Sequence, residues 1–481
     1  GGSTIREIYR AHSEFSRLKT ELYLSYKSTL VSSAAKMCEY QAIADCYDGQ
    51  SVFMTGGTGF LGKVLLEKLL YSCSGIDKIY LLVREKQGAT PQQRVQKILE
   101  QPLFSRLKEE KPKALDKIVP IVGDISEPQL GLKADDEELL VEKVSFVYHV
   151  AATIKFNEPF EQAMNVNVAG TGRVLNLTKR MKNIKAFLYV STAYSNTDRK
   201  VVEEVIYPAP ASLNEVKKLL EIGLSDKQVK ELINGRPNTY TFTKALAEHL
   251  VADNHGRIPA VIIRPSIVTS SEREPMVGWI DNWFGASALF TSIMKGLNRV
   301  LLAEPDNRLD LIPVDYVSNL IIVAAARCKC AKKVDVYNCS TSGDNPITIG
   351  QFAELAIADS KKHKFYDVPM PMVFFTSYKW MVMMITLLTQ TLPAYIADIF
   401  LLIRGKKARY VKLQSRVGHI RDTLEYFTLN TWSISALKTR ELSKSLSPSD
   451  RQLFPCDPTD IDWKTYVPIY CQGIRQFLCK R

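Results

Sequence analysis

The segment Thr55–Gly62 constrains the fold of this chain more than any other feature. Its glycines stand at Gly56, Gly59 and Gly62, directly after the apolar run Ser51–Met54. A side chain at Gly56 would strain a tight turn, one at Gly59 would block a pyrophosphate, and one at Gly62 would hold a following helix away from the strand. Because a helix start also offers unpaired N–H groups to an anion, the segment predicts a dinucleotide-binding loop.

Apolar runs and helical patterns alternate after this loop. The predicted strands are Ser51–Met54, Lys78–Val83, Ile118–Val122, Ser145–Val150, Ala186–Ser191 and Ala260–Ile263, and two predicted helices are Lys63–Tyr71 and Arg94–Glu100. Such continuous apolar runs are typical of strands that are covered on both faces. The sequence therefore predicts the α/β fold class, with a Rossmann-type doubly wound parallel sheet.

Composition narrows the range of partners. The chain has 481 residues, 46% of them hydrophobic, and a net charge of +12, which favours an anionic partner such as a phosphorylated cofactor, coenzyme A, an acidic membrane or nucleic acid. Nucleic acid is not predicted, because the lysines are dispersed and no recognition motif accompanies them. The nine scattered cysteines and the lack of a secretory signal predict reduced thiols in a cytosol-facing protein. Cys328-Lys-Cys330 lacks the spacing of a zinc site, so no metal is predicted.

Three domains are predicted. Residues 1–47 form an N-terminal helical extension, because apolar residues recur there at helical spacing. Residues 48–350 form a dinucleotide-binding Rossmann domain with substrate-binding insertions. Residues 351–481 form a mainly helical C-terminal domain that associates with a membrane.

The membrane prediction rests on the apolar segment Met372–Ile403. The uncharged stretch between Lys379 and Asp398 is interrupted by Gln390 and Pro393, whereas a spanning helix needs about 20 apolar residues. A membrane span, an interfacial hairpin and an apolar substrate channel all stay open. Five basic residues follow, which fit anionic lipid headgroups or a solvated helix face: Arg404, Lys406, Lys407, Arg409 and Lys412.

Tyr240 and Lys244 are the first candidates for chemistry. A spacing of four puts both side chains on one face of a helix, a turn apart. A phenol has an ordinary pKa near 10 and exchanges protons poorly at neutral pH unless a cation is close, and Lys244 is expected to supply that cation. The alternative is a structural pair that has this spacing by chance.

Ser191 and Thr192 follow the fifth predicted strand, at the end where open parallel sheets bind ligands. Thr192 is the preferred hydrogen-bond donor to a substrate carbonyl. The alternative is that both hydroxyls only bond to the backbone of the turn.

Arg84 ends the second predicted strand, where an arginine accommodates the 2′-phosphate of NADPH and an acidic residue would hold the ribose of NADH. Glu85 should point elsewhere because side chains alternate along a strand. Gly123–Ile125 and His149–Ala152 follow the third and fourth strands, where an adenine ring would lie. His149 is interpreted as a packed strand residue rather than a base.

These motifs together resemble an extended short-chain dehydrogenase/reductase. More narrowly, Gly123–Ile125, Val190–Tyr194, Ile263–Ile267 and Leu311–Asp315 look like the fatty acyl-CoA reductases. The C-terminal motifs that match the second domain of that family are Leu424–Thr428, Trp432, Cys456–Pro458 and Ile461–Tyr466. The resemblance covers nearly everything from Asp48 onward. It is strongest to moth pheromone-gland members, which share Tyr207-Pro208 and Pro468–Tyr470.

The resemblance implies NADPH-dependent reduction of a long-chain fatty acyl-CoA to the primary alcohol, with a role in pheromone biosynthesis. The implied catalytic residues are Tyr240, Lys244, Thr192 and Ser191. The implied cofactor-binding residues are Thr55, Gly56, Thr58, Gly59, Phe60, Leu61, Gly62, Arg84, Asp124, Ile125, Ala151, Ala152, Lys244 and Pro265. A membrane surface and a homodimer are the expected further partners. The endoplasmic reticulum membrane, on its cytosolic face, is the expected location, with the peroxisomal membrane as the alternative.

Direct hydride attack on the thioester is the expected route, because no cysteine nucleophile stands near the predicted site. Thr192 would hold the resulting oxyanion and Tyr240 would protonate it. Coenzyme A then leaves, and a second NADPH reduces the bound aldehyde, with Lys244 holding the nicotinamide ribose. Two rivals stay open, a nucleotide-sugar epimerase or dehydratase and a non-catalytic Rossmann scaffold. Arg84 and the apolar Met372–Ile403 segment disfavour the first, and the intact catalytic residues disfavour the second.

Overall fold

The computed structural model describes residues 40–85, 88–233, 235–329 and 331–480. Within these, the described residues from Ile43 onward form one compact unit. Most of the helical extension predicted for residues 1–47 lies outside the described residues. Its last part belongs to this unit, because the hydroxyl of Tyr47 donates to the carbonyl oxygen of Ile322 at 2.6 Å. The three predicted domains remain a proposal.

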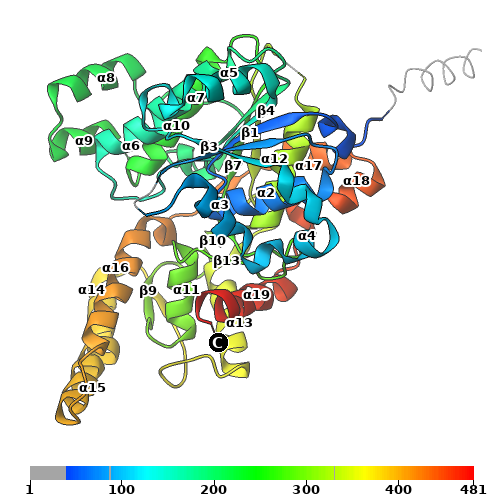
Figure 1. The fold of residues 1–481 in the computed structure, drawn as a ribbon. Helices are drawn as coiled ribbons and strands as arrows, with labels where there is room; N and C mark the ends of the chain where they lie inside the picture. Colours follow the sequence, from blue (N-terminus) through cyan, green and yellow to red (C-terminus); the bar gives the residue numbers. More distant parts are fainter. Residues whose placement is uncertain (1–39, 86–87, 234, 330, 481) are drawn as a thin grey trace, which may run out of the picture. The chain divides into compact units, whose positions relative to one another are not determined.

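A seven-stranded sheet lies at the centre of this unit, in the order β12-β7-β5-β4-β1-β2-β3 with every pair parallel (Figure 1). Its strands are β1 (Ser51–Thr55), β2 (Ile79–Val83), β3 (Ile118–Val122), β4 (Val144–His149), β5 (Ala186–Val190), β7 (Ala260–Pro265) and β12 (Asp335–Cys339). The order reverses between β1 and β4, which opens a crevice at the carboxyl ends of these strands. The predicted Rossmann-type fold is confirmed, and β12 is the one strand of this sheet that was not predicted.

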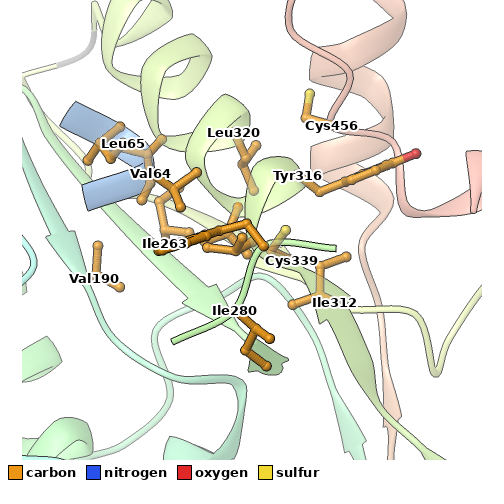
Figure 2. Close-up of a cluster of buried hydrophobic side chains, with 14 of the residues drawn as sticks. Val64, Leu65, Val190, Ile263, Ile280, Ile312, Tyr316, Leu320, Cys339 and Cys456 are labelled. Carbon is orange, nitrogen blue, oxygen red and sulfur yellow. The ribbon is translucent and has the colours of Figure 1, made fainter. Parts of the chain in front are cut away.

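Helices cover both faces of the sheet, because side chains alternate along each strand. In β1, Val52 and Met54 belong to the core on one face and Phe53 to the core on the other. Figure 2 shows part of the first core, where Leu65 and Leu320 pack between the sheet and its helices. The first layer contains α2 (Phe60–Ser72), α3 (Pro91–Leu99), α4 (Ser105–Glu110) and α12 (Val314–Arg327), and the second contains α5 (Ala134–Lys143), α7 (Gly170–Thr178) and α10 (Thr239–Asn254).

The C-terminal region is mainly helical, as predicted. Its helices are α13 (Ile349–Lys362), α14 (Lys379–Thr386), α15 (Leu392–Ile403), α16 (Tyr410–Leu429), α17 (Leu437–Lys444), α18 (Pro448–Leu453) and α19 (Trp463–Gly473).

The other α-helices of the described residues are α6 (Phe160–Ala163), α8 (Leu213–Ile222), α9 (Asp226–Ile233) and α11 (Ala286–Met294). Four two-stranded sheets pair β10 (Arg308–Leu309) with β13 (Ile347–Thr348), β11 (Leu311–Pro313) with β8 (Ile267–Thr269), β14 (Phe374–Thr376) with β9 (Val300–Leu302), and β15 (Ser433–Ile434) with β6 (Val201–Val202).

The C-terminal region also returns to the central sheet. The buried carboxylate of Glu204 accepts hydrogen bonds from the N–H groups of Asn338 in β12 (3.0 Å) and Thr439 in α17 (3.2 Å). One carboxylate therefore fastens α17 to the edge strand of the sheet.

A helical hairpin is formed by α14, α15 and α16. A π-helical turn, Leu387–Thr391, joins α14 to α15, so that Lys379–Ile403 is one continuous helix. Within the described part of the chain, this is the one helix whose length and composition would allow it to cross a bilayer, and only 17% of its most apolar window is buried. α16 packs against α15.

Candidate active site

The glycine loop joins β1 to α2. Gly56 has φ +76°, in the left-handed region that favours glycine, and a Cβ there would lie 2.5 Å from the backbone nitrogen of Ala151. A Cβ on Gly62 would lie 2.2 Å from the carbonyl oxygen of Gly56, so α2 packs against the turn only because Gly62 has no side chain. Gly59 is the exposed N-cap of α2. The first turn of α2 therefore opens toward the crevice.

The crevice is a cavity of about 570 Å³ at the carboxyl ends of the central strands. Every catalytic and cofactor-binding residue predicted from the sequence lines this cavity. Residues that stand far apart in the chain are thus brought to one place. Their individual roles remain proposals.

Tyr240 lies in the first turn of α10 and faces the cavity, half-buried. Burial raises the pKa of Tyr240 to about 12, although a hydrogen bond with Thr192 acts in the opposite direction. Burial is the largest influence on this pKa, and the role of Lys244 as a neighbouring cation stays a prediction. Tyr240 is therefore a protonated phenol at neutral pH, which suits a proton donor.

Lys244 is buried one turn further along α10. Its Nζ donates to the carbonyl oxygen of Val190 at 2.6 Å and lies 4.6 Å from the ring centroid of Tyr189. Burial lowers the pKa of Lys244 to about 7, and the charge of Glu248 partly offsets this. The charge on Lys244 is consequently lost as the pH rises through neutrality.

Ser191 and Thr192 differ in their hydrogen bonding. Oγ1 of Thr192 accepts from the N–H of Tyr194 at 3.3 Å and caps the following turn, so the backbone-bonding alternative holds in part for this residue. The buried Oγ of Ser191 has no hydrogen-bond partner among the described residues, and the same is true of Ser266 on the cavity wall. Because an unpaired buried hydroxyl costs free energy, these two are groups that a bound ligand would satisfy. Ser266 was not predicted.

Two arginines lie at the end of β2. The side chain of Arg84 is 68% exposed, and its Nη1 lies 3.6 Å from Oδ2 of Asp124. Arg94 of α3 also lines the cavity, and its Nη1 donates to the carbonyl oxygen of Arg84 at 2.5 Å. Arg94 was missed, although a helix start at Thr90 and Pro91, just after this strand end, is a readable signal. Glu85 is not part of the wall, as the alternation along the strand predicts.

His149 is fully buried beside the glycine loop. Its Nδ1 and Nε2 are hydrogen-bonded to the hydroxyls of Thr55 (2.8 Å) and Thr171 (2.9 Å). Burial, with a smaller effect of Lys244, lowers the pKa of His149 to about 3. His149 is thus a neutral packing residue, in agreement with its interpretation from the sequence.

Comparison with known proteins decides the family. A family model described as "Male sterility protein" matches residues 54–321, and a second model with the same description matches residues 389–481. Fatty acyl-CoA reductase 1 of Pongo abelii is 38% identical over 443 residues, covering 91% of this chain and 86% of that protein. The Homo sapiens protein of the same name is 37% identical with the same coverage. This chain belongs to the fatty acyl-CoA reductase family.

The other comparisons agree with this assignment. Fatty acyl-CoA reductase wat of Drosophila melanogaster is 34% identical, covering 90% of this chain and 85% of that protein. The terminal R domain of the myxalamid biosynthetic pathway has a TM-score of 0.61 at 22% identity, covering 89% and 90% of the two chains, and shows the fold alone. Family membership sets aside the epimerase and scaffold alternatives. The narrower resemblance to moth pheromone-gland members remains a prediction.

In this fatty acyl-CoA reductase, aromatic rings from three distant segments meet beside Tyr240. The ring centroid of Phe156 lies 6.2 Å from that of Tyr240, 5.0 Å from that of Phe284 and 5.6 Å from that of Phe427. Phe427 comes from the C-terminal end of α16. This cluster was not predicted, because no local pattern connects these three positions.

Proposed function

We propose that this fatty acyl-CoA reductase uses NADPH to reduce a long-chain fatty acyl-CoA to the primary alcohol through an aldehyde that stays bound. Membership of the family supports the substrate class. The observation that carries the proposal is that Tyr240, Lys244 and Thr192 line the same cavity as the glycine loop. A phenol, an amine and a hydroxyl thus line the cavity that also contains the glycine turn.

The residues present fit NADPH. The first turn of α2 would hold the pyrophosphate, since Gly59, Phe60 and Leu61 line the cavity and a helix start offers unpaired N–H groups to an anion. Arg84 and Arg94 would hold the 2′-phosphate, and the unpaired hydroxyls of Ser191 and Ser266 offer further hydrogen bonds. When bound, NADPH supplies the hydride for each of the two reductions.

The side chains of the cavity then stabilise the thioester carbonyl oxygen and protonate it. Thr192 holds the thioester carbonyl oxygen and stabilises the negative charge that develops there. Tyr240, which is protonated at neutral pH, transfers its proton to that oxygen. The thiohemiacetal collapses to the aldehyde and the thiol of coenzyme A, and Tyr240 recovers a proton from solvent. The same residues protonate the alkoxide in the second reduction, and Lys244 orients the nicotinamide ribose.

A cysteine-bound acyl intermediate has no support in this cavity. None of the described residues that line it is a cysteine, and Cys73, Cys339, Cys456 and Cys471 are buried thiols whose pKa values are raised by burial. A thiol is a poor nucleophile until it ionises. Direct reduction of the thioester is therefore the route that we propose.

The aromatic cluster beside Tyr240 is the proposed contact for the acyl chain. Phe156 touches both Tyr240 and Phe427, so the methylene groups next to the thioester would pack on these rings. The surface of the hairpin supports membrane association, with the cytosolic face of the endoplasmic reticulum proposed and the peroxisomal membrane as the alternative. The pheromone role rests on the sequence resemblance, and the homodimer remains a proposal.

The test is incubation of purified protein with saturated and unsaturated acyl-CoAs of increasing length, with NADPH or NADH, and product identification by mass spectrometry. We expect fatty alcohol and free coenzyme A, with NADPH preferred. The absence of alcohol with every acyl-CoA would contradict the activity. A hydrazine reagent that traps most of the product as free aldehyde would contradict the bound intermediate.

A further inference from the structure

The helical hairpin buries polar side chains between its helices and exposes apolar side chains on its outer surface. The side of Lys379–Ile403 that faces α16 includes buried Gln390 and Asp398, and the Asp398 carboxylate accepts hydrogen bonds from the N–H groups of residues 409–411. The side that faces away is apolar and open, with Met383 at 72%, Phe400 at 60% and Ile403 at 75% exposure. A water-soluble hairpin would bury such side chains between its helices. The outward face is therefore suited to a hydrocarbon environment.

The contact between Lys379–Ile403 and α16, here called the seam, contains further polar groups. Gln390 and Arg421 line a cavity of about 180 Å³ between the two helices, and neither polar atom of the Gln390 side chain has a partner among the described residues. Nη1 of Arg421 donates to Thr386 across the same seam at 2.7 Å. Polar groups thus gather between the helices, while apolar groups gather outside.

α16 argues against a crossing of the bilayer. It packs on α15, and both α14 and α16 contact β9, so α16 runs back along the long helix. If the hairpin crossed a bilayer, α16 would cross as well. Its exposed positions include Lys412, Arg416 and Asp422, and charged side chains are strongly unfavourable in the hydrocarbon region. Length and composition make Lys379–Ile403 a candidate span, but its partner helix does not share that property.

We propose that the hairpin docks in the plane of one anionic phospholipid leaflet. The apolar face of Lys379–Ile403 lies among the acyl chains, α16 faces water, and the basic turn residues Arg404, Lys406 and Lys407 pair with lipid phosphates and carboxylates. This inference deepens the membrane association proposed above and rests on it. It also places one end of α16 at the leaflet, while Phe427 at the other end lies in the aromatic cluster beside the cavity.

Co-sedimentation of the full chain with vesicles tests the docking face. On phosphatidylcholine vesicles that contain phosphatidylserine, the variant L388E/F400E should lower the vesicle-bound fraction about 10-fold or more, because two acyl-chain contacts are replaced by charges. The matched control H419E/T423E adds the same residues on the exposed face of α16 and should bind like the parent. Equal binding by both variants, or an equal loss in both, would overturn the proposed face.

Two further experiments test the basic turn and the in-plane orientation of the hairpin. Lys406→Gln together with Lys407→Gln should lower binding about 10-fold on vesicles with phosphatidylserine and leave the weaker binding to pure phosphatidylcholine unchanged. Lys407→Cys, labelled on vesicle-bound protein with a membrane-impermeant maleimide, should react to the same extent before and after detergent. Labelling that requires detergent would show that the turn has crossed the bilayer, and the in-plane proposal would then be wrong.

Acyl-CoA reduction in detergent micelles tests the proposed activity separately from the proposed docking to the membrane. The parent and all hairpin variants should be equally active there, since none of the changed residues lines the catalytic cavity. A variant that is inactive in micelles is misfolded and is replaced by the single substitution Leu388→Glu, for which about a threefold or larger loss of binding is expected. Inactivity of the parent would count against the proposed function and not against docking.

Discussion

The central sheet and the helical hairpin contain similar apolar residues and use them in opposite ways. Every residue of β1, β2 and β5 is buried, with both faces of each strand covered by helices. In the most apolar window of Lys379–Ile403, only 17% is buried. The comparison teaches that an apolar pattern predicts removal from water, whereas the topology decides whether protein or lipid provides the cover.

The largest effect is expected in the cavity at the carboxyl ends of the central strands, which we propose to hold the chemistry. Tyr240→Phe removes the proton donor and keeps the ring, so the rate of alcohol formation should fall by about 10²–10⁴-fold while NADPH affinity stays the same. Single-turnover kinetics and NADPH fluorescence titration measure the two quantities. A variant with near-parental turnover would refute the proton-donor role.

Glycines in the two regions should respond in opposite directions. Gly62→Ala forces a Cβ to 2.2 Å from a backbone oxygen, so we expect a loss of about 2–4 kcal/mol in the free energy of unfolding. Gly418→Ala in α16 meets no atom within 4 Å and should gain up to about 1 kcal/mol through helix propensity. Urea unfolding of both variants supplies the comparison. Similar shifts in both would mean that packing does not distinguish the regions.

Lys244→Met should remove the proposed contact with the nicotinamide ribose and raise the free energy of unfolding. Burial lowers the pKa of Lys244 from its ordinary 10.5 to about 7, so between these values the unfolded chain binds more protons and the stability of the parent rises with pH. The variant loses this dependence. It should be more stable than the parent by about 2–4 kcal/mol below pH 7, and the gain should shrink toward pH 10. Unfolding at several pH values measures this.

Lys217→Met is the matched control, because Lys217 is exposed on α8 and should show no such pH dependence. A constant difference between Lys244→Met and the parent across this pH range would mean that Lys244 is not held in its low-pKa environment.

Arg84→Ala should have the smallest effect and should act on the ligand alone. The side chain is 68% exposed and its ion pair with Asp124 is long, so the free energy of unfolding should change by less than about 0.5 kcal/mol. The Michaelis constant for NADPH should rise about 10-fold and that for NADH should hardly change, because only NADPH carries the 2′-phosphate. An equal rise for both cofactors would assign Arg84 another role.

The sheet and the glycine loop were predictable because their signals are local. A strand that is buried on both faces must be apolar throughout, and a turn that needs φ +76° at Gly56 must have glycine there. β12 escaped prediction because it mixes Asp335 and Asn338 with apolar residues. Asn338 is buried there, and its side chain donates to the carbonyl oxygen of Ser435 at 2.8 Å, a contact across many residues of sequence.

Local signals in the sequence established the fold class and the glycine loop, since backbone sterics and side-chain periodicity act over a few neighbouring positions, and the family resemblance supplied the candidate site residues. Only the tertiary structure decided that the pKa of Tyr240 is raised rather than lowered, that Arg94 and Phe427 reach the cavity region, and that the hairpin turns its apolar face outward. Burial, distance and the sharing of a surface between distant segments arise only when the chain is packed. That is the physical reason why the chemistry of the site could be listed from the sequence but not its electrostatics or its lipid-facing side.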